Sequence, residues 1–251
     1  MRNSVVIGCF REDAEIYRDG YAVVAIDVIR ATTTAITAVA AGRRCFPVPS
    51  VEAALLLQRQ LPNSLLAGEI SGDIPQEFEL NNSPAEIASR MDFDRPLVLL
   101  SSSGTKLICA ARRCNFAYLA CFRNCASLSQ YLIDRHSRVA LIGAGTRGEF
   151  REEDQICCAW LARELIEAGY EPEDDRTSLI VDRWSTATVR ACLCSKSVDY
   201  LRRSGQTRDL DFTLEHVNDL PQVFMMRNGE VAIVATPVAV GYRSATSLAR
   251  A

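Results

Sequence analysis

Histidine is almost absent from this chain of 251 residues, which contains only His136 and His216. This scarcity excludes a metal centre built from several histidines, since zinc sites of that kind need a group of imidazoles close together. Ten cysteines are present, but no two have the C-x-x-C spacing of structural zinc sites or thioredoxin-like centres. A chain of this length and aliphatic content needs no disulfide framework. We therefore interpret the cysteines mainly as small apolar core residues of a reduced protein.

Long apolar runs and a strong excess of either charge are also missing. The apolar stretch at residues 5–10 is too short for a signal peptide, and no run approaches membrane-spanning length. The net charge of −3 gives no reason to expect a nucleic-acid partner. With 48% hydrophobic residues the chain can bury a sizeable core. We predict one cytoplasmic domain spanning residues 1–251, with no membrane partner; whether it forms a homo-oligomer is left open.

Short aliphatic runs alternate with helical patterns through most of the chain. The expected strands cover residues 23–26, 44–48, 65–67, 97–100, 116–120 and 138–142. The expected helices cover residues 32–41, 51–60 and 152–168, with another beginning at Pro84. This alternation predicts a layered α/β/α fold with a mixed, mainly parallel sheet. Residues 176–203 favour helix and residues 223–234 a hairpin turned at Asn228-Gly229; we expect both to pack on the main sheet.

A carboxylate, Asp27, follows the apolar strand at residues 23–26. Burying it is costly unless it is paired or bound to a metal. Two interpretations therefore stand: Arg30 forms a salt bridge with Asp27, or Asp27 binds a metal and Arg30 an anion beside the hydroxyls and free amides of a helix start. Glu69 ends the strand at residues 65–67 in the same way. Carboxylates at parallel strand ends can converge, and hard oxygen ligands suit Mg²⁺.

Two loops between strands and helices are candidate anion sites. The first, residues 101–105 (Ser-Ser-Ser-Gly-Thr), offers hydroxyls and amides that suit phosphate or sulfonate, although serine-rich surface loops are common. The second, residues 143–148, matches the dinucleotide pattern G-x-G-x-x-G but lacks an acid at the end of a following strand. Acids near Asp154 stabilise a helix start or supply a metal ligand. We favour the interpretation that this glycine turn lies near a bound anion. An NAD-dependent oxidoreductase is the alternative.

Several of these motifs occur in one order that resembles the 2-phosphosulfolactate phosphatase family. They are, in chain order, residues 26–33 (Ile-Asp-Val-Ile-Arg-Ala-Thr-Thr), Pro47-Val48 with residues 51–54, Gly68-Glu69, Asn82-Ser83-Pro84, residues 102–105, Gly143-Ala144-Gly145-Thr146 with Gly148-Glu149-Phe150, and Glu153-Asp154 with Cys157. The resemblance extends from about Val23 to the hairpin at Asn228-Gly229. A set of motifs in one order is far more specific than any single motif.

The resemblance implies a Mg²⁺-dependent hydrolase that converts (2R)-2-phospho-3-sulfolactate to 3-sulfolactate and phosphate, a step of coenzyme M biosynthesis in methanogens. It also implies a layered α/β fold with a mixed sheet. In one position the chain departs from the family it resembles: family members usually carry an asparagine where Ser103 stands. The shorter side chain implies that a contact to the organic part of the substrate is lost or filled by water.

These observations together predict a site for a small anionic phosphomonoester. The expected catalytic residues are Asp27, Arg30 and Glu69, and the expected Mg²⁺ ligands are Asp27, Glu69 and Asp154. The expected substrate contacts are Thr32, Asn82, Ser83, Ser102, Ser103, Gly104, Thr105, Gly145 and Arg147. Whether Asp27 attacks phosphorus or orients water stays open. A non-catalytic binder of small anionic acids is the remaining alternative.

Overall fold

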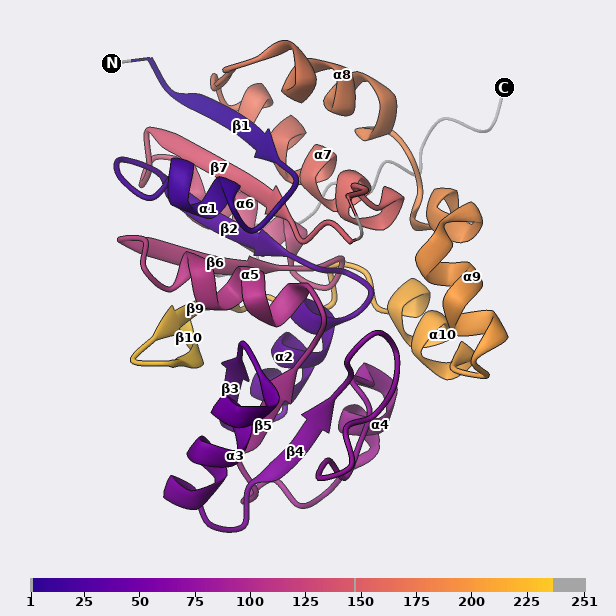
Figure 1. Cartoon of the computed structure of the whole chain (residues 1–251). Helices are drawn as coiled ribbons and strands as arrows, with labels where there is room; N and C mark the ends of the chain where they lie inside the picture. Colours follow the sequence, from indigo (N-terminus) through magenta and orange to yellow (C-terminus); the bar gives the residue numbers. More distant parts are fainter. Residues whose placement is uncertain (1, 147, 237–251) are drawn as a thin grey trace.

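The computed structural model describes residues 2–146 and 148–236. In this part of the chain ten strands form one sheet in the order β4-β5-β3-β10-β9-β6-β2-β7-β1-β8 (Figure 1). The strands are β1 (Ser4–Gly8), β2 (Ala22–Ile26), β3 (Cys45–Val48), β4 (Leu65–Gly68), β5 (Leu97–Leu100), β6 (Phe116–Ala120), β7 (Arg138–Gly143), β8 (Glu171–Pro172), β9 (Val223–Arg227) and β10 (Glu230–Ala235). Each strand predicted from the sequence is present, and β1 and β8 are additional.

The sheet consists of two parallel blocks joined by an antiparallel hairpin. One block is β8-β1-β7-β2-β6 and the other is β3-β5-β4. The hairpin β9–β10 lies between them, with β9 antiparallel to β6 and β10 antiparallel to β3. The expected hairpin and its turn are therefore confirmed, but the prediction that it packs on the sheet is wrong. It is part of the sheet.

Both faces of the larger block are buried, as its composition requires. Val23 and Ala25 of β2 face one core and Val24 and Ile26 face the other, and all four are fully buried. A strand covered on both faces has no polar side, which explains its continuous apolar sequence. Helices α1, α2 and α5 contribute to the first core and α6, α7 and α8 to the second. The predicted layered α/β fold with a mainly parallel sheet is confirmed.

The helices account for most of the remaining chain. They are α1 (Asp13–Ile16), α2 (Ala31–Ala40), α3 (Val51–Gln60), α4 (Pro84–Ser89), α5 (Gly104–Ala111), α6 (Cys125–Leu132), α7 (Glu152–Glu167), α8 (Asp175–Trp184), α9 (Lys196–Arg203) and α10 (Thr207–Glu215), with a 3₁₀ helix at Val189–Cys194. Ser50 caps α3, and Pro84 begins α4 as the sequence predicts. No described helix has both the length and the apolar character that crossing a membrane requires.

Helix α2 is buried on nearly all sides, which explains its composition of small residues. It packs against α4, α5 and strands of both blocks, so only alanine, threonine and short aliphatic side chains fit around it. The hydroxyls of Thr32, Thr33 and Thr34 donate to carbonyl oxygens of residues 27, 28 and 30. These bonds fix the turn that leads out of β2.

The ten cysteines are all free thiols, and most are buried. Cys157 and Cys158 lie on α7 with no exposed surface. Burial raises the pKa of both thiols well above the usual value. The interpretation of these two cysteines as core residues is confirmed.

Candidate active site

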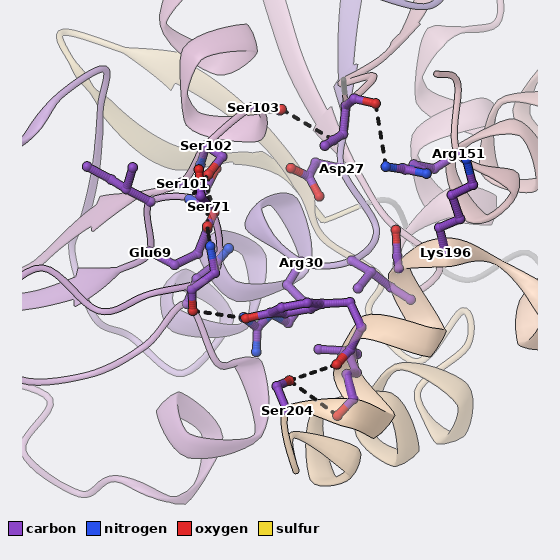
Figure 2. A pocket seen from close by; sticks show the side chains of 18 of the residues that line it. Asp27, Arg30, Glu69, Ser71, Ser101, Ser102, Ser103, Arg151, Lys196 and Ser204 are labelled. Atoms are coloured by element: carbon purple, nitrogen blue, oxygen red, sulfur yellow. Dashed lines mark hydrogen bonds between the residues drawn. The ribbon is translucent and has the colours of Figure 1, made fainter. Parts of the chain in front are cut away.

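A cavity of about 910 Å³ lies where β2, β4, β5 and β7 end, with α9 forming another wall (Figure 2). Asp27, Arg30 and Glu69, the predicted catalytic residues, all line it. Basic side chains outnumber acidic ones on its wall although the whole chain has a net negative charge. The charged residues of the wall are Asp27, Glu69, Glu149, Arg30, Lys106, Arg151, Lys196 and Arg203. We refer to this cavity as the cleft.

Asp27 is placed in the cleft by the turn after β2. Its backbone N–H donates to Thr32 Oγ1 at 3.0 Å, and its carbonyl accepts from the Thr32 hydroxyl at 2.7 Å. Gly104, the first residue of α5, lies directly against the Asp27 carboxylate. A Cβ at position 104 would overlap Asp27 Oδ2 and lie 2.6 Å from Ala31 Cβ. The absence of a side chain at Gly104 therefore lets the N-terminus of α5 approach Asp27.

Two further carboxylates, Glu153 and Asp154, are buried beside Asp27. Asp154 Oδ1 accepts a hydrogen bond of 2.8 Å from the N–H of Val28. Burial raises the pKa of Asp27 to about 7, with the charges of Glu69 and Glu153 adding to the effect. Burial and the neighbouring Asp27 charge raise the pKa of Asp154 well above its usual value. Glu153 is 1% exposed, and within the described part of the chain its Oε2 has no hydrogen-bond partner. Negative charge concentrated in this way favours a bound cation.

Glu69 holds two loops of the cleft together. Its Oε1 accepts from the N–H of Ser102 at 2.7 Å, and its Oε2 accepts from the Ser102 hydroxyl at 2.8 Å. Oε2 also accepts from the N–H of Gly72 at 2.7 Å. Ser102 Oγ in turn accepts from the N–H of Ser71. The carboxylate of Glu69 thereby joins the loop after β4 to the loop after β5.

The serine-rich loop has an outer and an inner part. Ser102 and Ser103 line the cleft, and Ser103 Oγ accepts from the hydroxyl of Thr146 at 3.3 Å (Figure 2). Thr105 instead faces inward, where it and Ser101 exchange backbone and side-chain hydrogen bonds at 2.9 Å. Thr105 therefore fixes the start of α5 and does not line the cleft, in contrast to the prediction.

Arg30 lines the cleft but its guanidinium is bound elsewhere in the protein. It forms a buried ion pair with Asp209 of α10 at 2.5 Å, and it also donates to Gln206 and Asn81. The interpretation of Arg30 as the salt-bridge partner of Asp27 is therefore wrong. This ion pair with the buried carboxylate of Asp209 joins the turn after β2 to α10.

The other predicted substrate contacts divide between the cleft and the scaffold. Asn82 lines the cleft, is 2% exposed, and has an Oδ1 with no partner among the described residues. Thr32 and Ser83 lie outside the wall, since Thr32 binds the Asp27 backbone and Ser83 caps α4 and donates to Asp209. Gly145 also lies outside it, in a turn with φ of +54° where a Cβ would meet the carbonyl of Cys9. Arg147 lies outside the described residues.

The sequence did not reveal the residues that α9 contributes. Lys196, Ser197, Tyr200, Leu201, Arg203 and Ser204 line the cleft, and all belong to α9 or the residue after it. Tyr200 reaches the loop after β4, where its hydroxyl donates to the carbonyl of Gly72 at 2.9 Å. Arg151 and Lys106 also line the cleft. Neither Lys196 nor Tyr200 follows a strand in the sequence. A search for polar residues at the ends of strands therefore misses both.

The residues of the site fit a magnesium ion held by few protein ligands. Among the described residues, no three His, Cys, Asp or Glu side chains lie close enough to enclose a metal ion. Mg²⁺ commonly keeps several waters and binds through one or two carboxylates together with a phosphate. Asp27 and Asp154 offer such oxygen atoms, whereas the oxygens of Glu69 already accept hydrogen bonds. The three-ligand set of Asp27, Glu69 and Asp154 stays a prediction.

A dinucleotide site at the glycine turn receives little electrostatic support. The first turn of α7 carries Glu152, Glu153 and Asp154. These acids cancel the positive end of the helix that would otherwise attract a pyrophosphate. His136 and His216 do not line the cleft, so no described histidine is available for acid–base work there.

Comparison with known proteins adds independent information. A family model described as 2-phosphosulpholactate phosphatase matches residues 10–229. A probable 2-phosphosulfolactate phosphatase of Clostridium perfringens is 26% identical over 248 residues, covering 96% of this chain and 99% of the relative. Proteins with the same name are 34% identical in Thermus thermophilus, covering 76% of this chain and 81% of the relative, and 30% identical in Deinococcus radiodurans over the same shares.

Proposed function

The chain belongs to the 2-phosphosulpholactate phosphatase family, and from that premise we propose that it hydrolyses 2-phosphosulfolactate to 3-sulfolactate and phosphate. The observation that carries the proposal is the position of Asp27. This buried carboxylate lies at the end of β2, against the N-terminus of α5, in a cleft where basic residues predominate. A phosphomonoester that also carries carboxylate and sulfonate groups matches that surplus of positive charge.

The cleft residues divide the work of phosphoryl transfer. Phosphoryl transfer depends on positioning and charge stabilisation more than on covalent chemistry. The N-terminal amides of α5 offer partial positive charge to a phosphate beside Asp27. Ser102 and Ser103 offer hydroxyls to it from the same loop. Asp27 either attacks phosphorus or orients the attacking water, and both roles need the position that Thr32 and Gly104 give it.

We further propose Mg²⁺ as the cofactor, with Asp27 and Asp154 as its first candidate ligands. When bound, Mg²⁺ supplies neutralisation of the charge on the phosphate oxygens and of the two buried carboxylates. Glu69 contributes by holding the loops after β4 and β5 at the cleft wall. A cytoplasmic location and a place in coenzyme M biosynthesis stay predictions from the sequence.

Phosphate release from a panel of phosphomonoesters tests the proposed function. The panel contains 2-phosphosulfolactate, phospholactate and p-nitrophenyl phosphate, each assayed with Mg²⁺ and with EDTA. We expect Mg²⁺-dependent release, fastest for the ester with carboxylate and sulfonate groups. If phospholactate is preferred instead, Ser103→Asn is the variant to test, because Ser103 stands where family members usually carry an asparagine.

Two outcomes would contradict the proposal. Binding of NAD(H) without release of phosphate from any ester would favour an oxidoreductase. Binding of the esters without turnover, with or without Mg²⁺, would favour a non-catalytic binder of small anionic acids.

A further inference from the structure

Two basic residues on the cleft wall share one carboxylate. Arg151 Nη1 donates to Glu149 Oε2 at 2.6 Å, and Lys196 Nζ is bound to Glu149 Oε1. Arg151 directly precedes α7 and Lys196 begins α9. Because one negative charge holds two positive ones, this trio leaves a net positive charge at the wall.

The two cations reach different depths of the cleft. The side chain of Arg151 is 12% exposed, whereas that of Lys196 is 67% exposed. Figure 2 shows the guanidinium of Arg151 directed toward the side of the cleft where Asp27 lies, with Lys196 beside it. Apart from Glu149, the one hydrogen-bond partner of the Arg151 side chain among the described residues is the carbonyl of Thr146 at 3.5 Å, a long contact. A guanidinium has five N–H donors in a planar fork, so donors remain for an anionic ligand.

The other basic residues of the wall are less suited to bind a second acidic group. Arg30 is committed to Asp209, Gln206 and Asn81. Arg203 is exposed, and its Nε donates to the carbonyl of Asp199. Lys106 belongs to the first turns of α5, the helix that begins beside Asp27 and so lies on the phosphate side.

We propose that Arg151 and Lys196 bind the acidic group on the alcohol part of the substrate, a carboxylate or a sulfonate. This inference rests on the proposed function, because it places the phosphate beside Asp27 and the rest of the substrate toward α9. Glu149 acts as a positioning residue that keeps both cations at the wall. The pair makes the enzyme selective for phosphomonoesters that carry a second anion, since the pair would gain nothing from an ester without one.

A comparison of two substrates across three variants tests the inference. The substrates are 2-phosphosulfolactate, which carries additional acidic groups, and p-nitrophenyl phosphate, which does not. The variants are Arg151→Met, Lys196→Met and the control Arg202→Met. Arg202 lies on the same helix as Lys196 and carries the same charge, but it does not line the cleft. The control therefore measures the effect of removing one positive charge from α9.

We expect the selectivity of the enzyme to fall when either cation is removed. The ratio of kcat/KM for 2-phosphosulfolactate to kcat/KM for p-nitrophenyl phosphate should fall about tenfold in each variant, mainly through KM, since a charge-assisted hydrogen bond is lost. Arg202→Met should keep the ratio of the parent enzyme. Because Lys196 is largely exposed, its variant should fold even if Arg151→Met does not.

The inference would be overturned if kcat/KM fell equally for both substrates or did not fall for either, because the ratio would then be unchanged. Either result would mean that the trio only fastens α9 to the loop before α7. If no ester is hydrolysed, the proposed function fails first. Calorimetric binding of 3-sulfolactate to the parent protein and to Lys196→Met then decides the inference separately: weaker binding in the variant supports it, and equal binding overturns it.

Discussion

Gly104 sets how closely the N-terminus of α5 approaches Asp27. A Cβ at this position would overlap the Asp27 carboxylate and press on Ala31. Asp27 lies on a turn that hydrogen bonds with Thr32 hold in place. The start of α5 is held by the hydrogen bonds between Ser101 and Thr105. Neither group can therefore move far. The distance between Asp27 and the N-terminus of α5 thus depends on the absence of a side chain at position 104.

Replacing Gly104 by alanine should therefore impair catalysis more than stability. We expect Gly104→Ala to lower kcat/KM by roughly 100-fold, because a displacement of about 1 Å at a reacting group has an effect of that order. The measurement is steady-state phosphate release together with thermal unfolding. Gly20→Ala is the contrasting control: no atom lies within 4 Å of the added Cβ, but φ at Gly20 is +85°, so this variant should lose stability and keep its activity. Activity close to that of the parent in Gly104→Ala would show that the contact with Asp27 does not matter.

The sequence predicts the strand-end residues of the site better than their partners. Asp27, Glu69 and Ser102 were expected because each follows an apolar strand, and all three line the cleft. Of the two interpretations of Arg30, the one that pairs it with Asp27, three residues away, is wrong. The true partner is Asp209 of a helix that the sequence did not predict. Proximity along the chain favoured the wrong pair, because no local pattern indicates where α10 folds back.

Asp209 joins helix α10 to two other parts of the fold. This carboxylate is 3% exposed and accepts hydrogen bonds from Arg30, from the Ser83 hydroxyl and from the N–H of Ala85. It thereby joins α10 to the turn after β2 and to the start of α4. A buried carboxylate with so many donors leaves them unpaired when it is removed.

Asp209→Ala should strongly destabilise the protein. We expect a loss of about 3–5 kcal/mol in the free energy of unfolding, since the buried Arg30 charge would lose its partner. Urea unfolding measures this loss. Asp211→Ala, which removes an exposed acid from the same helix, should change the free energy by less than about 0.5 kcal/mol. A small effect of Asp209→Ala would mean that water replaces the carboxylate and that α10 is held by other contacts.

The hairpin β9–β10 shows the limit of prediction for a whole element. Asn228-Gly229 identifies the turn from the sequence alone, and positive φ angles at both residues confirm it. The place of the hairpin in the sheet depends instead on pairing with β6 and β3, more than one hundred residues earlier in the chain. The junction with β3 consists of one residue pair, Val231 with Cys45. So short a junction leaves no pattern that the sequence could reveal.

The whole molecule brings together strand ends that belong to different parallel blocks. Asp27 follows β2 of the larger block and Glu69 follows β4 of the smaller one, with the hairpin between the blocks. Both residues nevertheless line one cleft, and Figure 1 shows β2 and β4 both pointing toward α9 and α10. Convergence of the two carboxylates was expected from the sequence. The division into blocks was not, because it depends on which strands pair.

Phosphate release by the Asp27→Asn variant tests the central claim most directly, namely that Asp27 is the centre of a Mg²⁺-dependent phosphomonoesterase. The variant keeps the size of the side chain and removes a buried carboxylate, whose pKa burial raises to about 7. We therefore expect thermal unfolding at the temperature of the parent protein or above it. The matched control is Asp175→Asn, an exposed acid on α8. The account predicts complete loss of Mg²⁺-dependent phosphate release in Asp27→Asn and full activity in the control, whereas full activity in Asp27→Asn would contradict it.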